Sequence, residues 1–528
     1  MSRMKIKDIY ILCLLGVLFF SCYEDKGNYN YEDVNQLKIQ FTDEVINCIM
    51  GDTLEIVPIY KFTTDSSHAN LTYEWSFLDS VISTERNLNY ILPEKTINEY
   101  VYLRVFDHNT NVSYISQVFL QITSLFQAHG WIVLSEKEGK SCLSMIREEI
   151  RKDQYGSYYY SYDDYLHVFE KMNGYALGTK PVKTLEHYSG EWGAIGQHWI
   201  IQQGEGGCID VSGTTFKKDI RLEETFLNGL PANFQPVDMI DTRWLTLIVN
   251  ANGDVYTRKK LTDKLYNSGY FLSDPLEFEG EKVDGRNMVL APFADFGFTL
   301  FYDKQHNRFL SLISRDEVSA GQIIAPEVYE RYYADKPHFS RLDNFKNKKI
   351  LHTGYYDVSG GYDLGFYSIL QDTEGNLYTH DFTIYKNIYS TSAPVATPVD
   401  EIKVDFRHVI DGTSKNVFRV IRYNKAPYIL ISKNNELWYY DRISKGEIKK
   451  YYTFDADICA IDYNIEDGTR VCIALENGKY HIMNFDRNTV NFGDETKRLK
   501  YSSSSDFGKI VDLKQKVLRQ FGWSWQQN

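Results

Sequence analysis

The sequence predicts an all-β protein in which a small β-sandwich precedes a β-propeller. The chain of 528 residues contains 41 Tyr and 30 Phe but only 12 Pro, and aromatic side chains suit the half-buried faces of sheets. Short apolar runs separated by turn residues recur along the chain, first irregularly and then as a repeated hairpin pattern. A chain of this length exceeds what one hydrophobic core usually serves, so at least two domains are expected.

The N-terminus, residues 1–21, has the composition of a lipoprotein signal peptide. A basic start precedes a largely apolar run at residues 9–20, and the small Ser21 precedes Cys22. This run is too short to span a bilayer comfortably, so we predict cleavage before Cys22 and lipidation of its thiol. A soluble secreted protein is the alternative. Residues 22–35 are polar and are predicted to form a flexible tether.

The charge of the chain argues against a nucleic-acid partner. Its formal net charge is −13, and loss of a signal peptide with three basic residues and one acidic residue leaves the mature chain near −15. No basic footprint for nucleic acid or anionic lipid is present in such a chain. Because no second apolar run approaches spanning length, we expect membrane contact through the N-terminal lipid alone.

Residues 36–125 are predicted to form the β-sandwich. Tyr73 and Trp75 fall on one face of a strand, where a central Trp typically fills a sandwich core. The strand-like runs, alternating in places, are residues 54–60, 71–75, 100–106 and 114–122.

Residues 126–528 carry a repeat of β-hairpins. An Asn-Gly turn or a relative supplies the positive φ angles of a two-residue hairpin loop. Such turns follow apolar runs at residues 252–253, 374–375, 434–435 and 477–478, with looser copies at 138–139, 204–207 and 307. The turns are roughly 40 to 70 residues apart, the range of propeller blades. We therefore predict a propeller, with seven blades favoured over six or eight, and a run of β-sandwiches is the competing hypothesis.

Two features of the C-terminal half complete this prediction. Apolar residues between 510 and 521 have near-helical spacing, so a packed helix is expected to close the domain. Cys459 and Cys472 flank a turn and are either free or disulfide-bonded. The other cysteines of the mature chain beyond Cys22 are Cys48, Cys142 and Cys208.

Catalytic motifs are absent from the sequence. It contains no HExxH, no GxSxG elbow, no Walker loop and no dinucleotide-binding glycine pattern. The 12 His are scattered singly, so neither a metal site nor a cofactor is predicted. Carboxylates from different blades can still meet in a propeller pocket, which keeps an enzyme as the weaker alternative.

Tyrosine-rich segments are the predicted binding features. Residues 155–165 combine Tyr, Ser and Gly, the mixture that adaptable recognition loops use, and residues 354–363 have the same chemistry. Alternate tyrosines on the core face of a strand, or a hairpin turn, explain these segments equally well. Trp192 is a candidate for stacking on a sugar ring, and the alternative is that it is buried in a sheet core. The candidate tyrosines are Tyr155, Tyr158, Tyr159, Tyr160, Tyr162, Tyr355 and Tyr356.

Two short motifs carry a resemblance to a known family. Residues 23–26, Tyr-Glu-Asp-Lys, resemble the acidic export signal of lipoproteins in starch-utilisation-type systems. The segment from Trp75 onward resembles the signature of the PKD-like, immunoglobulin-type domain. It keeps Trp75, Phe77 and Asp79 but loses both glycines, which puts the tight turn in doubt. With the hairpin-repeat body, the whole chain resembles PKD-like family lipoproteins encoded beside SusC/SusD-type importers.

This resemblance implies a lipid-anchored protein of the outer membrane that faces the cell exterior. It implies as partners a SusC/SusD-type importer, neighbouring surface lipoproteins and a peptide or glycan ligand. Two function classes follow. In the first, a non-catalytic lipoprotein captures ligand or scaffolds the importer; in the second, the propeller is a hydrolase or lyase acting on a polymer. The first is favoured because nothing in the chain requires catalysis.

Overall fold

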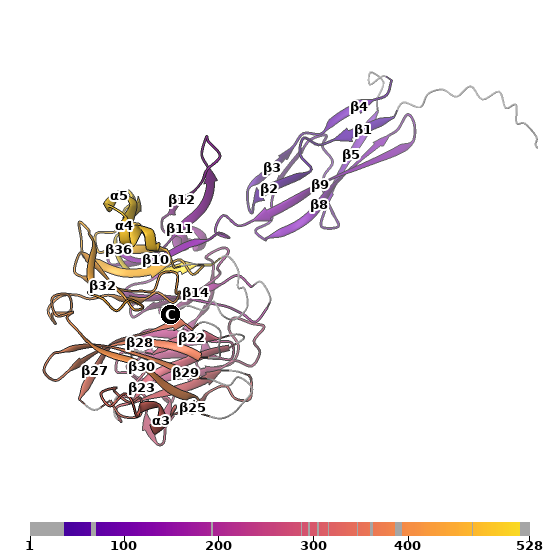
Figure 1. Cartoon of the computed structure of the whole chain (residues 1–528). Helices are drawn as coiled ribbons and strands as arrows, with labels where there is room; N and C mark the ends of the chain where they lie inside the picture. Colours follow the sequence, from indigo (N-terminus) through magenta and orange to yellow (C-terminus); the bar gives the residue numbers. More distant parts are fainter. Residues whose placement is uncertain are drawn as a thin grey trace, which may run out of the picture. The chain divides into compact units, whose positions relative to one another are not determined.

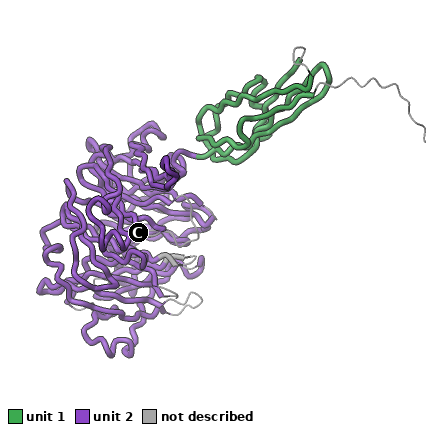
Figure 2. The backbone as a smooth tube through the Cα atoms, turned by 45° about the horizontal axis from the view of Figure 1, so that its top comes forward, with its two compact units in different colours: residues 1–123 green, residues 124–528 purple. Residues whose placement is uncertain are grey.

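The chain forms two compact units, Met1–Thr123 and Ser124–Asn528 (Figure 2). The predicted signal peptide, Cys22 and the tether lie outside the described residues. No helix in the described part is long and apolar enough to cross a membrane. The structure is a computed structural model that describes residues 36–517 except 65–69, 192–193, 287, 294–295, 304–305, 315, 346, 359–362, 386–392 and 467.

The first unit is a β-sandwich (Figure 1). One sheet has the order β2-β9-β8-β5-β6, and two further pairs, β1–β4 and β3–β7, complete the sandwich. The pairing of β2 with β9 is parallel and the others are antiparallel. The strands are β1 Leu37–Gln40, β2 Val45–Ile49, β3 Thr53–Ile56, β4 Ile59–Phe62, β5 Leu71–Phe77, β6 Ser80–Ser83, β7 Leu88–Ile91, β8 Ile97–Asp107 and β9 Val112–Thr123.

Trp75 lies at the centre of the sandwich core, as predicted. It is fully buried, and its indole Nε1 donates a hydrogen bond to the Glu85 carbonyl at 2.9 Å. The tight turn after β5 is retained without glycine, because Leu78 and Asp79 adopt φ angles of 49° and 59°. The run predicted at residues 54–60 is two strands.

The second unit contains seven blade-like sheets among the described residues, which confirms the predicted propeller (Figure 1). Blade 1 consists of β39 Lys509–Lys516, β10 Gly130–Lys137, β11 Lys140–Lys152 and β12 Tyr158–Tyr165. Blade 2 consists of β13 Pro181–His187, β14 Gln197–Gln202, β15 Ile209–Val211 and β16 Lys218–Arg221, and blade 3 consists of β17 Pro236–Asp241, β18 Leu245–Asn250 and β19 Val255–Lys259. Blade 4 consists of β22 Val289–Phe293, β23 Phe296–Asp303, β24 Arg308–Ser314 and β25 Gln322–Ile324.

The last three blades follow the same plan, with one extra strand, β26, added to blade 5. Blade 5 consists of β27 Lys348–Asp357, β28 Asp363–Asp372, β29 Leu377–Tyr385, β30 Val395–Val404 and β26 Glu327–Val328. Blade 6 consists of β31 Phe418–Val420, β32 Tyr428–Lys433, β33 Glu436–Asp441 and β34 Lys449–Thr453. Blade 7 consists of β35 Ile458–Tyr463, β36 Arg470–Leu475, β37 Tyr480–Asn484 and β38 Leu499–Ser502. The remaining elements are α2 Val168–Asn173, η1 Leu222–Thr225, β20 Glu277–Phe278, β21 Glu281–Lys282, α3 Glu330–Tyr333, α4 Arg487–Phe492 and α5 Glu495–Arg498.

Each predicted hairpin joins the second and third strands of one blade. The turn at residues 252–253 joins β18 to β19, and the turn at 434–435 joins β32 to β33. Gly253 and Asn434 have φ angles of 96° and 51°, the left-handed conformation that such turns require.

The C-terminal residues form a strand, so the helix predicted at residues 510–521 is wrong over its described part. β39 pairs antiparallel with β10 and contacts both β13 and β35, which joins the last blade to the first. A register shift between Leu134 and Ser135 leaves Val511 as an extra residue, a β-bulge. The bulge places Ile510 and Leu513 on one buried face, which gave them a spacing that resembles a helix.

The five cysteines beyond Cys22 are free. Cys459 lies on β35 and Cys472 on the neighbouring β36, but the residue opposite Cys472 is Asp462. The two cysteines are therefore not cross-strand partners, because the register offsets them along the strands.

Candidate functional site

The innermost strands of all seven blades line one cavity of about 350 Å³. A cavity of this size is at the lower end of the range for small-molecule sites. Because every blade contributes to it, the cavity lies along the propeller axis, and we call it the axial cavity. Each of these strands contributes at least one lining residue: Lys514 from β39, Lys183 from β13, Asp238 from β17, Leu290 from β22, Tyr355 from β27, Arg419 from β31 and Ala460 from β35.

Lys514 is the most unusual residue of the axial cavity. The residue is 9% exposed, and the described residues offer its ammonium no hydrogen bond or ion pair. Burial lowers the pKa of Lys514, although the nearby Asp512 opposes this shift. Asp512 also lines the cavity, and its Oδ2 accepts a hydrogen bond from the Thr184 backbone N–H at 2.9 Å. Burial raises the pKa of Asp512. An enclosed ammonium without a direct partner is costly unless something else neutralises it.

Two guanidinium groups lie in the same cavity, and carboxylates hold both. Arg419 donates to Asp462 Oδ1 at 2.5 Å. Arg422 donates to both carboxylate oxygens of Asp357, at 3.0 and 3.1 Å, and lies over the ring of Tyr355 at 5.5 Å. These pairs fix the guanidinium groups in position.

The axial cavity is also lined by a neutral imidazole and by an ion pair. Burial, with Arg419 nearby, lowers the pKa of His352 to about 4, so its imidazole is neutral at pH 7. Lys183 and Asp238 form an ion pair on neighbouring strands. The cavity thus offers one unpaired ammonium, fixed arginines, carboxylates and the ring of Tyr355 to a small polar ligand.

The predicted tyrosine-rich segment is a projecting hairpin rather than a loop. Beyond Arg147, β11 pairs with β12 but not with β10, so the end of this hairpin extends past its blade (Figure 1). The side chains of Tyr155, Tyr158, Tyr159 and Tyr160 are 84%, 69%, 48% and 39% exposed.

The remaining predicted binding residues lie elsewhere. Tyr162 is buried between Trp131 and Tyr501, with ring centroids 6.0 and 5.0 Å away, so it is a core residue. Tyr356 is also buried, and its hydroxyl donates to Asp381 at 2.7 Å. Of these candidates, Tyr355 is the one that lines the axial cavity. Trp192 lies outside the described residues.

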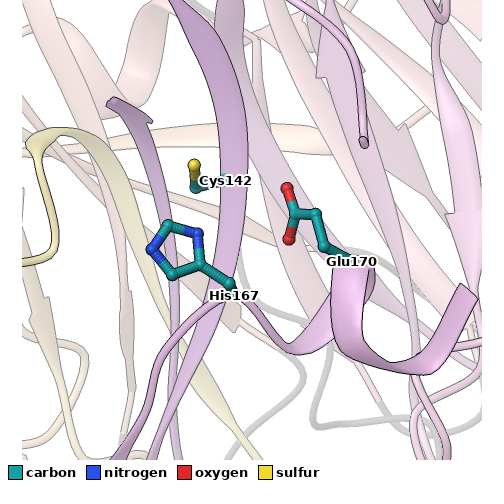
Figure 3. Close-up of side chains that lie close together, drawn as sticks. All are labelled: Cys142, His167 and Glu170. Carbon is teal, nitrogen blue, oxygen red and sulfur yellow. The ribbon is translucent and has the colours of Figure 1, made fainter. Parts of the chain in front are cut away.

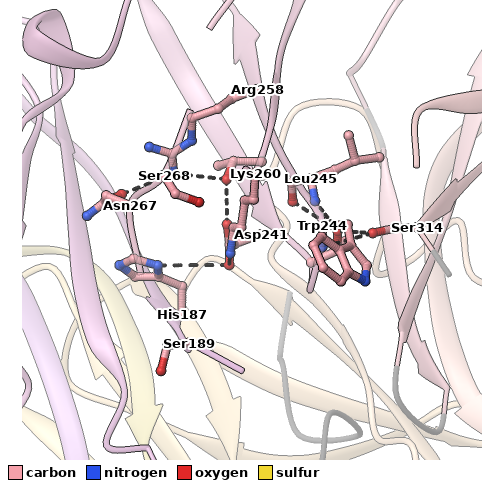
Figure 4. Close-up of polar contacts among 12 residues, drawn as sticks. His187, Ser189, Asp241, Trp244, Leu245, Arg258, Lys260, Asn267, Ser268 and Ser314 are labelled. Atoms are coloured by element: carbon pink, nitrogen blue, oxygen red, sulfur yellow. Dashed lines mark hydrogen bonds and ion pairs between the residues drawn. The ribbon is translucent and has the colours of Figure 1, made fainter. Parts of the chain in front are cut away.

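A network of buried charges joins blades 2 and 3 (Figure 4). His187 Nε2 lies 2.9 Å from Asp210 Oδ1, and Lys260 Nζ lies 2.8 Å from Asp241 Oδ2. All four side chains are at most 1% exposed, so a ligand cannot reach them. Burial lowers the pKa of Lys260, and Asp241 opposes that shift. The network is therefore assigned to packing between blades and not to a site.

A cluster of metal-binding residue types lies beside blade 1 (Figure 3). It consists of Cys142, His167 and Glu170, whose potential ligand atoms all lie within 4.8 Å of one another. Sequence reasoning missed this cluster, because 25 residues separate the Cys from the His and no metal-site spacing marks them. Sequence reasoning also missed Lys514, which the helical hypothesis placed on a closing helix.

Comparisons with solved structures give weak likenesses over most of the chain. A quinonprotein alcohol dehydrogenase-like protein from Bacteroides thetaiotaomicron has a TM-score of 0.34 and 11% identity, with 92% of this chain and 95% of that chain covered. BamB from Moraxella catarrhalis has a TM-score of 0.32 and 9% identity, with 72% and 89% covered. At these scores the likenesses add nothing to the strand pairing described above.

Comparisons with curated proteins find no match to the sequence. The model of the PKD-like family matches residues 22–181. This range contains the sandwich and strands β10–β12 of blade 1. The N-terminal part of the chain is therefore similar to the PKD-like family, as the segment around Trp75 predicts.

Proposed function

We propose that this protein is a lipid-anchored binding protein of the cell surface that captures a short oligopeptide in its axial cavity. It would act beside a SusC/SusD-type importer of the outer membrane. The observation that supports this proposal is the buried ammonium of Lys514, which faces the cavity without a direct partner among the described residues. A ligand carboxylate would supply the missing charge.

An oligopeptide suits the cavity better than a neutral glycan does. A peptide carries a carboxylate for Lys514 and an ammonium for Asp512, and both of these residues line the cavity. A neutral sugar would leave the buried ammonium uncompensated, which costs free energy. The ring of Tyr355 adds apolar contact area beside Arg422.

Calorimetric titration of the mature protein with trialanine, its C-terminal amide and maltotriose tests the proposal. We expect trialanine to bind roughly tenfold or more tightly than the amide, and maltotriose not to bind. Lys514→Met should weaken trialanine binding by a similar factor. Its melting temperature should stay nearly unchanged, because the substitution also removes a buried ammonium that has no direct partner.

Lys516→Met is the matched control. Lys516 is buried two residues further along β39, outside the axial cavity, and Glu186 lies close enough to oppose the burial-induced lowering of its pKa. This variant should therefore keep trialanine binding. Equal binding of trialanine and its amide, or binding of maltotriose alone, would overturn the oligopeptide proposal. Cleavage of trialanine during the titration would favour the hydrolase alternative.

A further inference from the structure

We infer that blade 1 carries a zinc site formed by Cys142, His167 and Glu170, separate from the axial cavity. Each residue offers one ligand atom, and these atoms converge within 4.8 Å of one another (Figure 3). Cys142 comes from β11, and the other two residues come from the start of α2. The inference is independent of the proposed oligopeptide binding.

The side chains of this cluster lack other partners that would explain their placement. Oε2 of Glu170 is buried and has no hydrogen-bond partner. Within the described part of the chain, neither the Glu170 carboxylate nor the His167 ring has a hydrogen bond or ion pair. The Cys142 thiol is buried, and its polar contacts are with backbone groups alone: a long contact of 3.8 Å with the Lys140 carbonyl and a hydrogen bond with the Lys137 backbone. A buried carboxylate oxygen without a donor is costly, and a bound cation would remove that cost.

The local backbone presents the three side chains to one another. His167 precedes α2 in the left-handed conformation, with φ 56°, and its backbone N–H donates to Ser144 Oγ at 3.1 Å. Glu170 follows three residues later in the first turn of α2, and α2 packs against β11. The imidazole and the carboxylate therefore both approach the strand that carries Cys142.

The types of ligand point to zinc. A thiolate, an imidazole and a carboxylate suit Zn²⁺, whereas Ca²⁺ and Mg²⁺ prefer oxygen ligands alone. Tetrahedral zinc needs ligand atoms about 3.5 Å apart, so any pair that lies nearer the 4.8 Å limit must move inward by about 1 Å. His167 and Glu170 are partly exposed and can rotate to do so, and water would complete the coordination. The bound ion would tie α2 to β11.

Metal titration of the mature, chelator-treated protein tests the inference. We expect zinc to raise the melting temperature by several degrees, because a ligand that binds only the folded state stabilises it. Cobalt at the same site should give the near-ultraviolet charge-transfer absorption of a thiolate ligand. His167→Asn should weaken zinc binding roughly tenfold or more, and Asn tolerates the left-handed backbone at this position.

Further variants separate this site from adventitious binding. Cys142→Ser should abolish the thiolate absorption, and Glu170→Gln should weaken zinc binding without changing the melting temperature of the metal-free protein. Cys208→Ser is the control, because Cys208 is also a buried free thiol but belongs to no described metal-binding cluster. An unchanged zinc response in His167→Asn and Glu170→Gln, or cobalt absorption that persists in Cys142→Ser, would overturn the inference.

Discussion

At the scale of single residues, Asp381 shows how burial changes the chemistry of a carboxyl group. Asp381 is 8% exposed on β29, and the Tyr356 hydroxyl donates to it at 2.7 Å. Burial raises the pKa of Asp381 from its usual 3.8 to about 6, although Tyr356, Lys445 and Arg442 oppose the shift. The folded protein therefore keeps a proton on Asp381 where the unfolded chain has lost it.

This difference predicts a pH dependence of stability. The raised pKa stabilises the folded state fully below pH 4, and this contribution is lost as the pH rises through 6, about 3 kcal/mol in total. Asp381→Asn removes the titration, so its stability relative to wild type should rise between pH 4 and 6 in urea unfolding experiments. The exposed Asp274→Asn is the control and should follow wild type; a parallel curve for Asp381→Asn would contradict the prediction.

At the scale of elements, the hairpin β11–β12 divides into a core half and a projecting half. Tyr162 lies in the half that packs against Trp131, and Tyr158 and Tyr159 lie in the half that extends past the blade. Exposed aromatic side chains on a projecting element add contact area for a partner and little to the core.

Replacement of these tyrosines separates the two halves. Tyr158→Ser combined with Tyr159→Ser should leave the melting temperature nearly unchanged, because both side chains are largely exposed. The same variant should retain less of its membrane partners in a pull-down from solubilised membranes. Tyr162→Ser should instead lower the melting temperature markedly, because it opens the core. Full partner retention by the double variant would place the partner surface elsewhere.

At the scale of the whole molecule, one blade joins the first and last described strands of the propeller unit. β39 completes blade 1, so the last described strand pairs with β10, the first strand of the second unit. This pairing brings Lys514 to the axis and removes two open sheet edges. The N-terminal sandwich forms a separate core around Trp75, before the first blade.

The proposed anchor makes a prediction for the whole protein. Cys22→Ala should leave the protein uncleaved or release it from the membrane fraction, because a stable anchor needs two or more acyl chains on that residue. Glu24→Ala combined with Asp25→Ala is the matched variant and should keep membrane association. This pair should lose accessibility to protease added to intact cells if the acidic residues direct export. Unchanged acyl labelling and fractionation of Cys22→Ala would refute lipidation, and unchanged accessibility of the double variant would refute the export signal.

The sequence by itself determined the hairpins of the second unit and the central strand of the sandwich. Asn-Gly turns specify hairpins through backbone conformation, so residues 252–253 and 477–478 predict their hairpins without knowledge of the fold. Both loops have three residues instead of the expected two, with the positive φ at Gly253 and Gly478. Tyr73 and Trp75 likewise predict a strand with one buried face. Such signals are local, because turn type and alternation depend on neighbouring residues alone.

Only the tertiary structure decided which residues form sites. The axial cavity collects single positions from seven strands that lie far apart in the sequence, and no local pattern marks Lys514 as one of them. A single bulge at Val511 made β39 resemble a helix. The extra residue puts side chains three positions apart, Ile510 and Leu513, on the same face of the strand, and this spacing is also that of a helix. Cys142 meets His167 only because β11 packs against α2. Sites of this kind depend on long-range pairing and packing, which local sequence patterns do not encode.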